Sequence, residues 1–205
     1  MALSKIDVAN MVTGATPVAN GGTGLTSGTT NQFLKFTGST TLASAADNAG
    51  ITNASQWRLT SGLTGATDPV SANLEKVDTD GYASLGSDMT VSSGIWTFPS
   101  TGIWIIKAHA NVYLNGDARH THFAIHTTTD NSSYSLAASG YAFLQQTQSN
   151  TAQSGMDTDF IFDVTNVTTH KCKFAFENLT NSNATLDAGT AVSYTWFTFI
   201  RLGDT

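Results

Sequence analysis

The segment 103–114 constrains the fold most, because its side chains alternate between apolar and polar types. Lys107, His109 and Asn111 occupy one parity. The other parity carries Trp104, Ile106, Ala108, Ala110, Val112 and Leu114. Successive side chains of a β-strand point to opposite faces, so the alternation predicts a strand with one buried face.

Short runs of β-branched and aromatic residues follow, separated by Gly, Asn, Asp and Ser turns at a spacing typical of a β-sandwich. Two further strands are predicted at 160–164 and 172–176. Their inward side chains are predicted to be Phe160, Phe162, Val164, Cys172, Phe174 and Phe176. Cys172, the single cysteine, is therefore expected to be a small core residue.

The last predicted strand, 191–202, carries apolar side chains on both faces. Phe197 and Phe199 lie on one parity. The opposite parity carries Val192, Tyr194, Trp196 and Ile200. Burial on both sides predicts a central strand whose second face meets another subunit.

The dipeptide Asn115-Gly116 follows the first strand, and 120–127 then alternates again. Asn-Gly is favoured in two-residue hairpins because both turn positions need positive φ. A β-hairpin is therefore predicted between these two strands.

Charge and composition exclude several functions. The 205 residues include only 9 Lys and Arg and carry a formal net charge of -6, which does not suit binding to a nucleic-acid backbone. One cysteine makes no internal disulfide, and no Cys/His cluster has the spacing of a structural zinc site. No window approaches the ~18 apolar residues of a membrane span, and the first residues lack the apolar region of a secretion signal.

The composition changes along the chain and predicts three regions. Residues 1–57 are poor in charge and rich in Gly and Thr, which indicates extended chain that becomes ordered only against something else. Residues 58–93 are interpreted as a linker or shoulder region. Residues 94–205 hold the core, so the predicted fold class is all-β, an antiparallel β-sandwich behind an extended N-terminal segment.

Two stretches resemble known families. Pro17-Val18-Ala19-Asn20-Gly21-Gly22-Thr23-Gly24 resembles a signature that recurs in tail-fibre and other appendage proteins of tailed bacteriophages, and Thr198–Thr205 resembles the end of marine phage appendage proteins. The C-terminal half resembles the trimeric jelly roll of the tumour necrosis factor family and of complement-like globular heads. An early strand of that fold has a Phe that is followed a few residues later by Gly-Ile/Tyr-Tyr/Trp. The stretch Phe98-Pro99-Ser100-Thr101-Gly102-Ile103-Trp104 has this pattern.

These resemblances imply a homotrimer with an N-terminal virion-attachment segment and a jelly-roll head. In the resembled fold the aromatic last strand sits at the trimer centre, which implies an interface at Tyr194, Trp196, Phe197 and Phe199. The implied docking residues on the virion are Pro17, Val18, Asn20, Gly21, Gly22 and Gly24.

Histidines at 120, 122 and 126 share one face of the second strand, with Phe123 and Ile125 on the other. Near a three-fold axis, the pair His120 and His122 of three chains could bind one metal ion. The alternative is that these histidines form a polar face that binds no metal. In that case no cofactor is expected. Asp157, Asp159 and Asp163 also share a face, and a solvated surface is the alternative to Ca²⁺ there. The run 78–81 begins like a calcium loop but lacks the closing acidic ligand, which favours a plain turn.

Two tyrosines are candidate receptor-binding residues. Tyr134 and Tyr141, together with Phe143, lie in or beside the polar stretch 127–153, whose amides and hydroxyls suit the hydroxyl groups of a sugar while an aromatic ring stacks on the sugar face. The alternative is a solvated loop, with Tyr141 and Phe143 part of an edge strand.

The sequence shows no G-x-S-x-G elbow, H-E-x-x-H pair, phosphate-binding loop or catalytic cysteine motif, so no enzyme is predicted. The predicted function is a structural component of a phage virion, made in the host cytoplasm: a trimeric appendage that binds other virion proteins and a host-surface glycan or protein. The first alternative is a capsid decoration or head-fibre protein. A cytokine- or complement-like ligand and a glycan hydrolase are further alternatives.

Overall fold

The computed structural model describes residues 29, 32–38, 41–45 and 50–205. The chain divides into two compact units, Met1–Ala49 and Gly50–Thr205. Within the first unit, β1 (Phe33–Gly38) pairs with β2 (Thr41–Ala45) in an antiparallel hairpin. The six predicted virion-docking residues between Pro17 and Gly24 lie outside the described residues.

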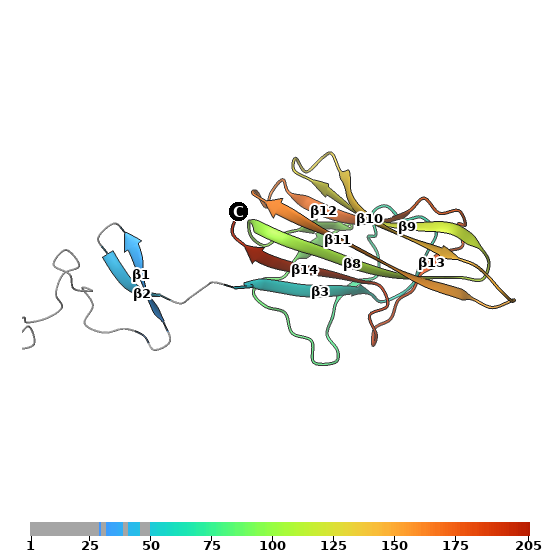
Figure 1. The fold of residues 1–205 in the computed structure, drawn as a ribbon, viewed down its shortest axis with the longest axis horizontal. Helices are drawn as coiled ribbons and strands as arrows, with labels where there is room; N and C mark the ends of the chain where they lie inside the picture. The colour runs from blue at the N-terminus through green and yellow to red at the C-terminus, as the bar shows by residue number, and fades with distance from the viewer. Residues whose placement is uncertain (1–28, 30–31, 39–40, 46–49) are drawn as a thin grey trace, which may run out of the picture. The chain divides into compact units, whose positions relative to one another are not determined.

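The second unit is a sandwich of two antiparallel sheets (Figure 1). One sheet has the strand order β10-β9-β12-β7-β6. Its strands are β10 (Ser135–Leu144), β9 (Ala118–Thr128), β12 (Lys171–Glu177), β7 (Ile95–Thr97) and β6 (Thr90–Ser92). We call it the five-stranded sheet.

The other sheet has seven strands, and β8 is its centre. The order is β4-β13-β8-β14-β3-β5, and β11 pairs with β8 along the remaining edge of that strand. The bounds are β4 (Leu63–Thr64), β13 (Thr185–Leu186), β8 (Gly102–Leu114), β14 (Trp196–Gly203), β3 (Asn53–Leu59), β5 (Leu74–Lys76) and β11 (Ala152–Val164). The all-β sandwich predicted from the sequence is confirmed.

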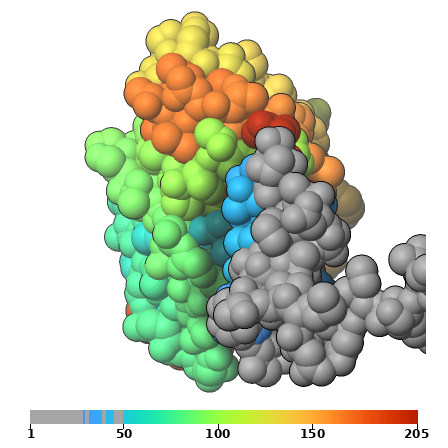
Figure 2. Space-filling model, turned by 90° about the vertical axis from the view of Figure 1, so that its left-hand side faces the viewer, coloured from blue at the N-terminus to red at the C-terminus, as the bar shows by residue number. Residues whose placement is uncertain are grey.

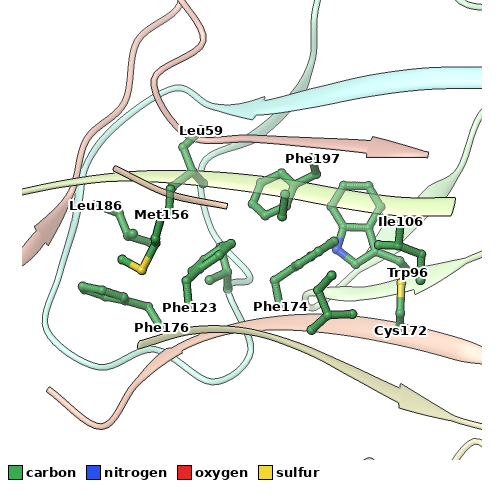
Figure 3. Close-up of a cluster of buried hydrophobic side chains, with 14 of the residues drawn as sticks. Leu59, Trp96, Ile106, Phe123, Met156, Cys172, Phe174, Phe176, Leu186 and Phe197 are labelled. Atoms are coloured by element: carbon green, nitrogen blue, oxygen red, sulfur yellow. The ribbon is translucent and has the colours of Figure 1, made fainter. Parts of the chain in front are cut away.

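The core lies between the two sheets, where Figure 3 shows aromatic and aliphatic side chains meeting from both layers. The predicted alternation of β8 is confirmed, since the residues of its apolar parity from Trp104 to Leu114 are all buried. Trp96 is a hub of this core. Its ring lies 4.9 Å from that of Phe199, 5.1 Å from that of Trp57 and 6.0 Å from that of Phe174.

The predicted hairpin at Asn115-Gly116 is wrong. β8 and β9 lie on either side of this turn but belong to different sheets, because β8 pairs with β11, β13 and β14, whereas β9 pairs with β10 and β12. Both edges of β8 are occupied within its own sheet. The Asn-Gly turn therefore reverses the chain by crossing the sandwich.

Two predicted boundaries also change. Residues 58–93 are not a separate linker, because they supply β4, β5 and β6 and bury Leu59, Val70 and Met89 in the core. The β-sandwich unit thus begins at Gly50 rather than near residue 94. The last strand begins at Trp196, not Ala191.

The two edges of the sandwich come from different parts of the chain. In Figure 2, the yellow and orange segments that include β10 and β11 form one edge, and green segments that precede β8 form the other. Close approach at the first edge depends on Gly140, where an added Cβ would lie 2.7 Å from the carbonyl oxygen of Asp157. The described residues include no helix long and apolar enough to cross a membrane.

The reactivity of the Cys172 thiol provides a test of the packing of β12. The thiol is fully buried, which confirms its place in the core, and burial raises its pKa far above the usual value. Because the thiolate is the reactive species, we expect iodoacetamide to leave Cys172 unmodified in the folded protein at pH 8 and to alkylate it fully in guanidinium chloride. Mass spectrometry measures the difference. Rapid labelling of the native protein would contradict this packing.

Candidate functional site

The outward face of β9 and β10 gathers the predicted histidines and one predicted tyrosine. Tyr141 pairs with His122 across the two strands, and their rings stack at 4.5 Å with an interplanar angle of 19°. The ring of His120 meets Tyr141 edge-on at 6.3 Å. The structure therefore brings a candidate receptor residue and both candidate metal ligands onto one surface.

His122 is the most enclosed of these side chains, with a relative exposure of 1%. Its Nδ1 lies 3.2 Å from the side-chain nitrogen Nδ2 of Asn178 and 3.3 Å from Oε1 of Glu177. The same Oε1 lies 3.3 Å from Nε2 of His126. The Glu177 carboxylate thus stands between two imidazoles, while Tyr141 covers one of them.

Burial lowers the pKa of His122 below its ordinary value of 6.5. The Glu177 carboxylate opposes this shift, and His126 and His120 add to it. Nε2 of His122 is buried and has no hydrogen-bond partner among the described residues. Protonation of His122 would therefore bury a positively charged ring in which Nδ1 has polar neighbours but Nε2 has none.

A pH prediction follows from this environment. As the pH falls through 6.5, the unfolded chain takes up a proton at residue 122 before the folded chain does, so the folded state loses stability until the lower folded-state pKa is passed. We expect the free energy of unfolding to decline as the pH falls below about 7. His122→Gln should make that decline shallower, as measured by urea unfolding at a series of pH values. The same substitution at His120 is the control, and an equal effect of both would contradict the prediction.

Within one protomer these histidines form no metal centre, and the predicted site draws its ligands from three chains. Within the described residues, no group of three or more His, Cys, Asp or Glu side chains could hold a metal ion. His120 and His122 also lie on the five-stranded sheet, opposite the sheet that contains the last strand. A trimer centred on the last strand would therefore keep the three histidine pairs away from its axis.

Tyr134 lies apart from Tyr141. It precedes β10, and its ring contacts the ammonium group of Lys173 at 5.3 Å, while Lys173 pairs with Asp68 at 2.6 Å. Burial raises the pKa of its hydroxyl. At the usual strand rise of about 3.3 Å per residue, the two tyrosines stand roughly 20 Å apart along β10 and do not form one site. Tyr141 and Phe143 both belong to β10, an edge strand, as the alternative interpretation held.

The predicted interface residues divide between two faces of β14. Phe197 and Phe199 are fully buried in the core of the protomer, so their side chains face the other sheet rather than a partner. Trp196 is half-buried on the outward face, where its ring stacks on His109 at 5.7 Å, and Tyr194 is exposed just before the strand. Only Trp196 and Tyr194 remain available to another subunit.

The outward face of the seven-stranded sheet carries an apolar row that the sequence did not identify as a unit. Ile105 in β8 lies opposite both Ile161 in β11 and Ile200 in β14, and Ile200 lies opposite Ala54 in β3. Residues directly opposite in antiparallel strands point to the same face. Ile161 is exposed and the other three are half-buried. We call these four residues the isoleucine row.

Two of the acidic candidates pair with basic side chains. Asp157, Asp159 and Asp163 are exposed on the outward face of β11, and Asp157 bonds Nδ1 of His109 at 2.8 Å. Asp78, the first residue of the calcium-like run, instead pairs with the buried Arg58 at 2.7 Å.

Comparison with known proteins places the fold. No protein-family model and no curated protein matches the chain. Among solved structures, murine APRIL at pH 5.0 is 11% identical and matches 73% of this chain and 98% of its own, with a TM-score of 0.52. Eiger TNF from S. frugiperda is 10% identical and matches 76% of this chain and 95% of its own, with a TM-score of 0.53.

The two sheets and these likenesses define a β-sandwich of the jelly-roll class. More particularly, the fold is a tumour-necrosis-factor-like jelly roll, as the sequence resemblance implied.

Proposed function

We propose that this protein is a non-enzymatic structural component of a tailed-phage virion, a homotrimeric appendage whose jelly-roll head binds the host surface. The isoleucine row is the observation that supports trimer formation most directly. Apolar side chains run across four neighbouring strands on a face that the protomer leaves open, and contiguous apolar patches of this kind mark association surfaces. Three copies present their binding surfaces together, which turns weak single contacts into strong attachment.

The virion role rests on the signature at 17–24, and the first unit adds support. The β1–β2 hairpin exposes Phe33, Leu34 and Phe36, and a two-stranded hairpin is marginally stable alone. Apolar side chains on such a hairpin suit a segment that is covered when it docks on another virion protein.

The experiment that tests this function is immunogold imaging of intact particles with an antibody against residues 50–205. Label on the tail, together with loss of adsorption when the gene is deleted, supports the appendage. Label over the capsid, together with normal adsorption when the gene is deleted, would instead support a capsid decoration protein. Absence of label from every particle would overturn a virion role.

A further inference from the structure

A small pocket lies where β9 begins and β10 ends. Its volume is about 350 Å³, and Phe143 forms an aromatic wall with a relative exposure of 69%. The lining residues are Asp117, Ala118, Arg119, Phe143, Leu144 and Gln145. Ligand pockets span about 300–1,000 Å³, so this one is the size for a single small ring rather than a large ligand.

A β-bulge creates the pocket. The β9–β10 register passes from Ala142 opposite Thr121 to Leu144 opposite Ala118, so that Phe143 faces two residues of β9 instead of one. Thr121 points into the core and is fully buried, and regular alternation would send Arg119 the same way. Arg119 is exposed instead and lines the pocket beside Phe143, because a bulge redirects side chains.

Two hydrogen bonds to Asp117 hold the pocket wall in place. The backbone nitrogen of Gln146 donates to Oδ1 of Asp117 at 2.7 Å. The side-chain amide of Asn181 donates to the Asp117 carbonyl oxygen at 3.1 Å. A site fixed before its ligand arrives loses less free energy to ordering.

The polar groups at the rim have unused bonding capacity. Within the described part of the chain, neither the Arg119 guanidinium nor the Gln145 amide makes a hydrogen bond or ion pair, and no hydrogen bond reaches Oδ2 of Asp117. Arg119 offers five N–H donors, Asp117 offers acceptor positions, and Gln145 offers both. Donors, an acceptor and an exposed phenyl ring therefore converge on one pocket.

We infer that this pocket binds a neutral hexopyranose unit of a cell-surface glycan. One face of a pyranose ring is lined with C–H groups that pack on an aromatic ring, while its hydroxyls both donate and accept. The Asp117 carboxylate accepts from two such hydroxyls and repels an anionic sugar, and Arg119 donates to hydroxyl or ring oxygens. The inference rests on the proposed function and deepens it, because it assigns the host ligand and moves its site from Tyr134 to Phe143.

Tyr141 extends the site along β10. It is 62% exposed and lies two residues from Phe143 on the outward face, about 6.6 Å away by strand rise. A second sugar of the same glycan reaches this ring when the first occupies the pocket. Stacking on His122 holds the Tyr141 ring in place for that contact.

Saturation-transfer NMR on the full-length protein tests the inference with maltotriose, cellotriose, lactose and mannobiose as neutral probes and trigalacturonate as an acidic one. We expect transfer to at least one neutral probe at millimolar concentration, and about tenfold weaker binding for Phe143→Ala and for Arg119→Gln. Phe36→Ala is the matched control, since it removes an equally exposed phenyl ring (71%) from the other unit. It should leave binding unchanged.

Four results would overturn the inference: no neutral probe binds, only trigalacturonate binds, binding survives Phe143→Ala, or Phe143→Ala dissociates the trimer. The last would show that the ring belongs to a subunit interface. Competition separates this inference from the proposed function. If purified protein blocks adsorption of particles but binds no oligosaccharide, the head still recognises the host, through a protein receptor, and only the glycan inference fails.

Discussion

Phe197→Ala is expected to lower the free energy of unfolding of the β-sandwich by about 3–5 kcal/mol. The side chain is fully buried between the two sheets, where its ring lies 4.5 Å from that of Phe174 and 5.8 Å from that of Trp96. Alanine removes the apolar contacts of the ring and leaves a cavity that the paired strands on both sides prevent from closing. Since domains have only about 5–15 kcal/mol of stability, the variant should be poorly folded at 37 °C.

Urea unfolding at a fixed protein concentration, followed by tryptophan fluorescence, measures this loss, and a fixed concentration is needed because association adds to apparent stability. Phe36→Ala again serves as the control and should leave the midpoint unchanged. A loss below about 1 kcal/mol for Phe197→Ala would mean that Phe197 is not enclosed in the protomer core.

The sequence predicted β8, β9 and β12 almost in full, but only 160–164 of β11, and it placed β10 within a polar stretch. β8 and β11 alternate for 13 residues with a single buried face, and β12 places Cys172, Phe174 and Phe176 on one parity. Local alternation is sufficient to identify such strands, and turn residues mark where they end.

Local sequence patterns do not show which strands pair when the strands are far apart in the sequence. β3 pairs with β14 across more than a hundred residues, and its own segment shows no clean alternation because Arg58 is buried by ion pairs with Glu75 and Asp78. β4 and β5, of two and three residues, are too short to show any period. The Asn115-Gly116 turn predicts a reversal of the chain but not which sheet receives it.

The candidate site shows the same division. Tyr141 and the histidines share a surface because period two places them there, which the sequence indicated for the histidines. The pocket at Phe143 depends on a register shift between β9 and β10, and a bulge changes which way a residue points without changing the sequence pattern. The isoleucine row likewise appears only when four strands are set side by side.

Ile105→Glu is expected to convert the protein from a trimer to a monomer. Ile105 stands at the centre of the isoleucine row, between Ile161 and Ile200, so a carboxylate there would be buried without a partner when subunits associate. Burying an unpaired charge costs several kcal/mol at each of the three equivalent interfaces. The side chain points away from the core, so the fold of the protomer should persist and only association should be lost.

Light scattering coupled to size-exclusion chromatography measures the outcome directly, with a mass of three times 21.6 kDa expected for the unmodified protein and 21.6 kDa for the variant. The matched control is Leu136→Glu, which introduces the same charge at an exposed leucine of β10 on the opposite sheet and should remain trimeric. A far-ultraviolet circular dichroism spectrum equal to that of the unmodified protein shows that Ile105→Glu is folded. A trimer that survives Ile105→Glu would place the interface elsewhere, whereas a monomeric unmodified protein would remove the physical basis for multivalent attachment.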